Sequence, residues 1–502
     1  MNDLTKGFWE NYTRFLKTSL ITEMPNPQTH DLAKLCREDL SQAFKLFKQQ
    51  ELNAIQTLYN SVDAIEKLRD DINNCIENRG RVFLVGCGAS GRLALVLKRL
   101  WGFYHSDIKD NPIINLSAGG DISLIKAVES FEDNPDLGLA QLYSYGYTSN
   151  DMIIGLSASG ESPFILAVCD YGIKHSKYPS YLVYNNPKQA LLERNSKHII
   201  SNPKLKTLEL IVGPMTLTGS TRLQATTVMQ IALGLALINE QNILSKLKSI
   251  YQELSRINIE DMATITQLEA NYLAQNNYIL YKCDDSLLGL SMLSDLTERA
   301  PTFNLTPFEN QQLDNVYSPF YLSFGKDLSQ DEVWDQLLGN KPYCLNLDEF
   351  NTTSLDYFKG FDLSVTSMRA HASYLDAPQL IQTWGVINDD LNIKFMDKEV
   401  SFKFSMDPLT RSVIYKILLN AHSTLMYGAL GYFENNLMLY LKPSNYKLID
   451  RAIRYTQFLL KQNHQQTYEY KIIADNLLQL IPKLKPKQSI VKLTIDVMLR
   501  QG

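Results

Sequence analysis

The chain has 502 residues, of which 45% are hydrophobic and 21% are charged, and its net charge at neutral pH is −5. This length predicts two or three domains, and the composition is ordinary for a globular protein with more than one buried core. The weak negative charge and the lack of a basic run argue against nucleic acid as a partner, so any anion site has to be local.

The cysteines and the N-terminal sequence indicate a cytoplasmic protein. Six cysteines are scattered along the chain with no C-x-x-C pair, so we expect neither a disulfide framework nor a metal site, and no other cofactor is indicated. The first residues, MNDLTKGFWENYTRFL, lack the basic segment followed by an apolar segment that is typical of a signal peptide. The longest apolar run, 228–238, falls short of the ~18 residues that a membrane span needs.

The first half of the chain alternates short apolar runs with helical stretches. After helical periodicity over 31–78, we predict strands at 81–85, 112–116, 152–156, 181–184 and 208–212, and helices at 91–104, 122–130, 163–175 and 220–239. This alternation predicts a doubly wound parallel sheet, an α/β fold that binds ligands at the carboxyl ends of its strands.

The second half resembles a degenerate copy of the first. A helical stretch over 246–275 precedes a strand at 278–282 and a helix at 287–297, and later apolar runs lie at 319–324, 362–366 and 380–384. Residues 410–502 are mainly helical, at 411–430, 447–461 and 468–480. We therefore predict four parts: an N-terminal helical segment (1–65), a first α/β domain (66–245), a degenerate second α/β domain (246–440) and a C-terminal helical cap (441–502).

The first turn that can carry chemistry is VGCGASGRLAL, residues 85–95. Its glycines permit a tight turn, and Ser90 together with the amides that begin the next helix can hold an anion. The G-x-G-x-x-G spacing does not indicate a dinucleotide site, because no acidic residue ends the following strand. A tight turn without a ligand remains the alternative for this motif.

The second turn, IIGLSASGESPF (153–164), carries three serines. The hydroxyls of Ser157, Ser159 and Ser162, with the amides that follow, match the three oxygens of a phosphate group. Simple capping of the next helix is the alternative. Two such turns in one sheet indicate a phosphate cradle more strongly than either turn alone.

A third segment, VGPMTLTGSTRLQA (212–225), places Thr218, Ser220 and Thr221 at the start of a long apolar helix. A binding role and a well-capped buried helix are equally compatible with this pattern.

These residues resemble the SIS (sugar isomerase) domain, whose second turn has the S-x-S-G-E-S form. The segments LITEMPNPQTHDLAKL, LSAGGDISLIKAVESFED (116–133) and GPMTLTGSTRL (213–223) are similar to two related groups, the N-acetylmuramic acid 6-phosphate etherases and the glucokinase regulatory proteins. LTERAPTFNLTPFEN (296–310) resembles a second, degenerate SIS helix, and PSNYKLIDRAIR (443–454) is similar to the C-terminal region of the regulatory proteins. Two SIS domains and a cap make those proteins the closer match.

The resemblance implies which residues hold the ligand. The phosphate would meet the two turns, two glutamates would reach the sugar, and an N-x-K segment would close the site from the cap. The residues at these positions are Gly88, Ser90, Gly91, Ser157, Ser159 and Ser162 for phosphate, Glu129 and Glu132 for the sugar, and Asn445 and Lys447 from the cap.

The resemblance also bears on catalysis. The etherase reaction needs two glutamates, one to help expel lactate and one to move the α-proton. Glu129 matches one of them, and counting from Ser90 puts Leu100 at the position of the other. Glu298, in T-E-R-A-P-T-F, belongs to the second domain, and we interpret it as a structural remnant. No catalytic residue is therefore expected, unless Glu129 serves an etherase.

The favoured function is thus a non-catalytic sensor of a hexose phosphate such as fructose 6-phosphate, which modulates a partner such as a glucokinase-like kinase. Two alternatives stay open: an etherase-like lyase or sugar-phosphate isomerase, and an interaction protein that has lost its ligand. Ala89, Met215 and Gln224 depart from the family pattern and leave the choice of sugar phosphate open.

Overall fold

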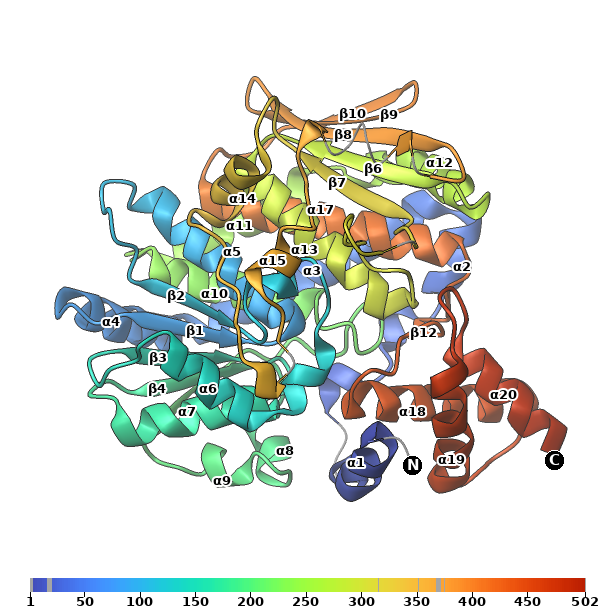
Figure 1. Cartoon of the computed structure of the whole chain (residues 1–502), viewed down its shortest axis with the longest axis horizontal. Coiled ribbons are helices and arrows are strands. Elements are labelled where there is room, and N and C mark those ends of the chain that lie inside the picture. The colour runs from blue at the N-terminus through green and yellow to red at the C-terminus, as the bar shows by residue number, and fades with distance from the viewer. Residues whose placement is uncertain are drawn as a thin grey trace.

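The computed structural model describes residues 3–15, 20–314, 316–350, 352–366, 372–373 and 375–501. It contains two five-stranded sheets with a layer of helices between them, and a small helical cap lies to one side beside the N-terminal helix (Figure 1). None of the helices in these ranges has the length and apolar character needed to cross a bilayer.

The first sheet is entirely parallel, and this confirms the predicted doubly wound fold. Its order is β2-β1-β3-β4-β5. The strands are β1 (Val82–Gly86), β2 (Ile113–Ser117), β3 (Met152–Leu156), β4 (Ser180–Tyr184) and β5 (Leu205–Glu209). The chain leaves β1 toward one edge for β2 and returns to the other side for β3, so the switch point lies between β1 and β3. The two serine turns follow these two strands, where such sheets bind ligands.

The second sheet is mixed rather than parallel. Its order is β10-β9-β8-β6-β7, with β6 parallel to β7 and β8, and with β8, β9 and β10 antiparallel. The strands are β6 (Tyr278–Cys283), β7 (Phe320–Phe324), β8 (Gln379–Ile387), β9 (Asp390–Phe395) and β10 (Lys398–Phe402). Asn388 and Asp389 both adopt positive φ, as a tight two-residue hairpin turn requires. The apolar run 362–366 forms no strand.

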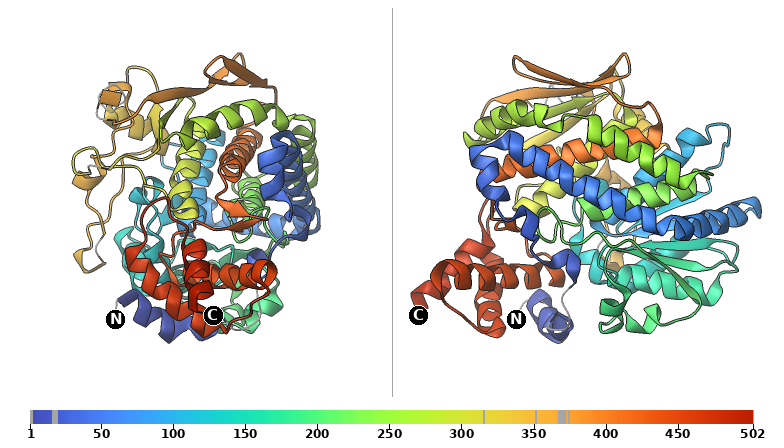
Figure 2. Two further views of the ribbon diagram at one scale, coloured as in Figure 1. Left: turned by 90° about the vertical axis from the view of Figure 1, so that its right-hand side faces the viewer. Right: turned by 180° about the vertical axis from the view of Figure 1, so that it is seen from behind.

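The helices fall into three groups. Those against the first sheet are α4 (Val62–Glu77), α5 (Gly88–Tyr104), α6 (Pro135–Ser144), α7 (Pro163–His175) and α10 (Gln224–Leu237). The cap contains α18 (Tyr446–His464), α19 (Tyr470–Leu480) and α20 (Ile490–Gln501). The others are α1 (Asp3–Asn11), α2 (Leu32–Glu38), α3 (Leu40–Thr57), α8 (Lys188–Leu192), α9 (Lys197–Ile200), α11 (Ile243–Arg256), α12 (Ala263–Ala274), α13 (Ser286–Phe303), α14 (Gln330–Leu338), α15 (Leu355–Phe358) and α17 (Pro408–Ala429). Seen from behind, α3 and α4 run across the helical layer (Figure 2).

The helix predicted at 122–130 is wrong. The segment instead forms two short 3₁₀ turns, Asp121–Leu124 and Glu129–Asp133, joined by a loop. Its backbone carbonyls serve tertiary contacts, since the carbonyl of Ser123 accepts from Arg92 and that of Leu124 accepts from Thr297. Those bonds compete with the i to i+4 bonds that a helix would need.

Helices α5 and α13 pack side by side and run in opposite directions. At one end Arg92, near the start of α5, pairs with Glu298, near the end of α13. At the other end Tyr104 of α5 donates to Asp407, which caps α17, and Arg411 of α17 pairs with Asp285 at the start of α13. The last turns of each helix therefore lie beside the first turns of the other.

The turn before α13 carries its own anion in place of a serine cradle. The Asp285 side chain accepts from the amide of Leu288 and pairs with Arg411 at 2.9 Å. A carboxylate at a helix N-terminus takes the position that a phosphate would occupy. This accounts physically for the degenerate appearance of the second half.

A buried carboxyl group lies where the two halves meet. Asp121 accepts from the amide of Tyr343 at 2.7 Å and is 5% exposed. Burial raises its pKa from 3.8 to about 6, while the Tyr343 amide and Lys98 act in the opposite direction. Because the native pKa lies above the unfolded one, stability from this group is fully present below pH ~4 and is lost as the pH rises through ~6.

In the wild type, the free energy of unfolding is expected to fall by about 3 kcal/mol between pH 4 and pH 7.5 because of this group. Replacing Asp121 by asparagine should remove that loss. Asparagine keeps an oxygen that can accept from Tyr343 but has no charge to bury. The measurement is the unfolding free energy of both proteins at each pH, with the exposed Asp110→Asn as the control. An unchanged pH dependence in Asp121→Asn would contradict the expectation.

Candidate functional site

The first serine turn is shaped by glycines that admit no side chain. A Cβ on Gly86 would lie 2.5 Å from the Ser90 backbone, and one on Gly91 would lie 2.2 Å from the Ser117 hydroxyl. Gly88 has a φ of 52°, which favours glycine. The turn therefore brings the first amides of α5 and the Ser90 hydroxyl close to the end of β1.

The second serine turn faces the first. The Ser157 hydroxyl accepts from the Gly160 amide at 3.1 Å, and that of Ser159 accepts from the Glu161 amide at 3.3 Å. Cys87 and Ser162 lie 3.5 Å apart between Sγ and Oγ and so link the two turns. The structure thus brings together the serines that the sequence singled out.

The space in front of the two turns has an inner and an outer part. The inner pocket, of about 90 Å³, is lined by Gly88, Ser90, Ser157 and Ser159. The outer cavity, of about 500 Å³, is lined by Ser162 and by apolar and charged side chains, many of them from the N-terminal segment and the cap. Gly91 lines neither. Four residues are common to both parts: Glu23, Glu132, Ser159 and Lys447.

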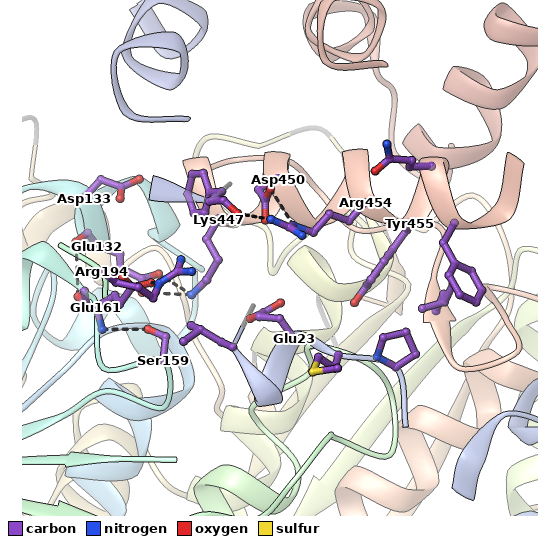
Figure 3. A pocket seen from close by; sticks show the side chains of 18 of the residues that line it. Glu23, Glu132, Asp133, Ser159, Glu161, Arg194, Lys447, Asp450, Arg454 and Tyr455 are labelled. Atoms are coloured by element: carbon purple, nitrogen blue, oxygen red, sulfur yellow. Dashed lines mark hydrogen bonds and ion pairs between the residues drawn. The ribbon is translucent and has the colours of Figure 1, made fainter. Parts of the chain in front are cut away.

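The cap closes over the site through an ion pair (Figure 3). Lys447 of α18 pairs with Glu132 at 2.9 Å, and the Asn445 amide donates to the same carboxylate at 3.3 Å. Asn445 also caps α18 by accepting from the Leu448 amide at 2.8 Å. Both cap residues predicted for the site thus contact a predicted glutamate. Glu129 begins the 3₁₀ turn that ends next to Glu132, but its side chain lies outside the described part of the chain.

A second ion pair, which the sequence did not suggest, joins the cap to the N-terminal segment. Arg451 and Glu23 form two parallel bonds of 2.8 and 2.9 Å. Both line the inner pocket, and a Cβ on Gly219 would come within 2.5 Å of the Arg451 guanidinium. Two signals could have found them: Glu23 lies in the family-like segment LITEMPNPQTHDLAKL, and Arg451 lies one helical turn after Lys447.

Glu298 of α13 lines the same inner pocket as Ser90 and Ser157. Leu100 does not: it is completely buried on α5, twelve residues after the helix starts at Gly88, as Glu298 is twelve residues after Ser286. Twelve residues of helix span about 18 Å. Because the two helices are antiparallel, the glutamate in the inner pocket comes from the second half, while the position of Leu100 lies away from that pocket.

The third motif forms the floor of the pocket. Gly219, Ser220, Thr221 and Arg222 line it, whereas Thr218 does not. Arg222 is 4% exposed and pairs with Asp295 of α13 at 2.7 Å. Burial alone would raise the pKa of Asp295, but Arg299 and Arg222 hold it below its ordinary value. The floor is thus fixed by buried charges that join both halves.

Comparisons with known proteins show which family the chain is similar to. The family model of the glucokinase regulatory protein N-terminal SIS domain matches residues 63–173. The N-acetylmuramic acid 6-phosphate etherase of Enterobacter sp. (strain 638) is 30% identical over 240 residues, which cover 47% of this chain and 74% of that protein. The enzyme of the same name from Pseudothermotoga lettingae is 30% identical over 238 residues, with 47% and 74% covered.

Two solved structures are similar at lower identity. A putative tagatose-6-phosphate ketose/aldose isomerase from Clostridium novyi has a TM-score of 0.45 at 12% identity, with 84% of this chain and 95% of that chain covered. The tagatose-6-phosphate ketose/aldose isomerase from Escherichia coli has a TM-score of 0.41 at 12% identity, with 79% and 97% covered.

The parallel sheet with two serine turns at its switch point defines a sugar-phosphate-binding protein of the SIS class. Within that class, the chain belongs to the family of the N-acetylmuramic acid 6-phosphate etherases.

Proposed function

We propose that this protein is an etherase-type lyase that acts on a phosphosugar of the N-acetylmuramic acid 6-phosphate kind. The observation that carries the proposal is the presence of Glu298 in the inner pocket, opposite the serines of the two turns. The etherase relatives, which share 30% identity with this chain, support the same reaction. None of the six cysteines, all of which the structure describes, is joined in a disulfide, and this supports a reducing, cytoplasmic setting.

The proposed chemistry assigns a separate task to each part of the site. The serine turns hold the phosphate with hydroxyls and helix-start amides. One glutamate takes the proton from the carbon next to the carbonyl group, the carbon–oxygen bond to lactate breaks as a double bond forms, and the other glutamate donates a proton to the departing oxygen. Glu129 and Glu298 are the pair proposed for these steps. Addition of water to the double bond then completes the net hydrolysis.

The test is to incubate the protein with N-acetylmuramic acid 6-phosphate and to measure lactate. Release that is proportional to enzyme and absent with Glu298→Gln supports the proposal. Binding of the sugar phosphate with no lactate above the blank overturns it.

A non-catalytic sensor is the second candidate, and one observation favours it. The cap contacts the rest of the site through charged side chains, the Lys447–Glu132 and Arg451–Glu23 pairs. An anionic ligand competes with these carboxylates for the cations and would shift the position of the cap. Such a sensor would bind a hexose phosphate, change its affinity for a partner such as a sugar kinase, and release no lactate.

A further inference from the structure

The side chain of Arg92 connects three parts of the site. It lies two residues after Ser90, in the first turn of α5, and is only 1% exposed. Its Nη1 donates to the carbonyl of Ser123 at 2.6 Å, and its Nη2 pairs with Glu298. The guanidinium of Arg92, which belongs to the helix after the first serine turn, therefore contacts both the loop that leads to Glu132 and the helix that carries Glu298.

A second contact strengthens the same junction. Thr297, the neighbour of Glu298, donates its hydroxyl to the carbonyl of Leu124, and Leu124 directly follows Ser123. Ser123 is held in turn by the Ser117 hydroxyl at 2.7 Å, at the end of β2. The last turns of α13 are thus fixed to the 121–124 turn by side chains on both sides of the interface.

Joining the two halves does not by itself require Arg92. One turn earlier on α13, Asp295 already accepts from Arg222, Asn420 and Ser423 at 2.7 to 2.9 Å, and it pairs with Arg299. Arg99, further along α5, also reaches across, to the carbonyl of Gln336 at 3.1 Å. What sets Arg92 apart is that its carboxylate partner lines the ligand pocket. Burying a guanidinium is costly, and a fixed fork is suited to orienting a carboxylate.

We infer that Arg92 is a positioning residue, which orients the Glu298 carboxylate toward a sugar held at the Ser90 turn. This inference rests on the proposed etherase function. It adds that one helix, α5, carries both Ser90 of the phosphate cradle and the arginine that holds the acid–base group. A misplacement of about 1 Å in such an alignment costs about 10²-fold in rate.

The test compares Arg92→Lys and Arg92→Met with Arg99→Met, which removes an arginine of the same helix that also bridges the halves. Lactate release gives kcat and KM, and calorimetry gives the affinity for N-acetylmuramic acid 6-phosphate. We expect Arg92→Met to lower kcat about 10²-fold and to leave KM and affinity within about threefold. Arg92→Lys keeps the positive charge but loses the planar, two-pronged guanidinium, so its kcat should lie between those of the wild type and Arg92→Met. The kcat of Arg99→Met should match that of the wild type.

Each outcome tests either the positioning role of Arg92 or the proposed etherase function. Equal kcat in Arg92→Met and Arg99→Met overturns the positioning role, as does a loss of affinity equal to the loss of kcat. If Arg92→Met does not fold, an unchanged kcat in Arg92→Lys overturns it. If the wild type releases no lactate, the etherase proposal fails. The positioning role is then judged from a crystal structure of Arg92→Lys, where a Glu298 carboxylate still in place contradicts it and a displaced one supports it.

Discussion

Glu298→Gln is expected to lower the rate of lactate release by about 10²–10⁴-fold, the usual contribution of a general acid or base. Glutamine has the shape of glutamate and can still accept a hydrogen bond from Arg92, but it cannot transfer the proton. Because the proposed site holds the phosphate at the serine turns and not at this carboxylate, the affinity for N-acetylmuramic acid 6-phosphate should stay within a few-fold. The two measurements are single-turnover lactate release and calorimetric binding.

The matched control for this substitution is Leu100→Met. Leu100 holds the corresponding position in the first half, twelve residues into α5, and is fully buried. A swap of similar volume in a core costs less than about 1.5 kcal/mol, so activity should be retained. Full activity in Glu298→Gln would remove this residue from the proposed mechanism. A large loss of activity in Leu100→Met without a loss of stability would instead indicate that the Leu100 position, which the count from Ser90 selected, belongs to the site.

The fold was largely predictable because its signals are local. The strands of the first sheet are short apolar runs, each followed by a turn or a helix start. Hydrophobic periodicity and turn-forming residues therefore locate them without tertiary information. The sequence pattern did not lead to a prediction of β9 and β10. In β9 the buried Leu391, Ile393 and Phe395 do alternate with polar residues, whereas β10 starts with the exposed Lys398 and Glu399 and has a weaker pattern. The helix predicted over 122–130 does not form because tertiary contacts, and not the segment's own residues, decide its shape.

The site was only half predictable, and the reason lies in the helix pairing. Ser90, Ser157 and Ser159 follow two neighbouring strands of one sheet, so their turns alone bring them together. Glu298 reaches the same pocket only because α5 and α13 pack antiparallel, and no feature of either helix alone specifies that direction. Glu23 and Arg451 likewise meet from segments more than 400 residues apart. Such contacts follow from how the two halves pack, which the local sequence pattern does not encode.

The combined change Ser157→Ala and Lys447→Ala is expected to weaken sugar-phosphate binding by about 10²–10⁴-fold. Each substitution removes a donor to a charged ligand, worth about 1.5–3 kcal/mol, and about 1.4 kcal/mol corresponds to a factor of ten. The two residues approach from opposite sides, one from the turn after β3 and the other from α18. Their effects should therefore be close to additive in a double-mutant cycle.

The fold should survive this double change. Ser157 loses two hydrogen bonds of its hydroxyl, to the Gly160 amide and to the Ser159 hydroxyl, and Glu132 keeps its contact with Asn445 after the lysine is gone. The control is Ser201→Ala with Lys471→Ala, two exposed positions away from the pocket. Calorimetry with N-acetylmuramic acid 6-phosphate and thermal unfolding of the unliganded proteins separate a loss of binding from a loss of stability. Unchanged affinity in the double variant would contradict the proposed binding of the sugar phosphate between the second turn and the cap.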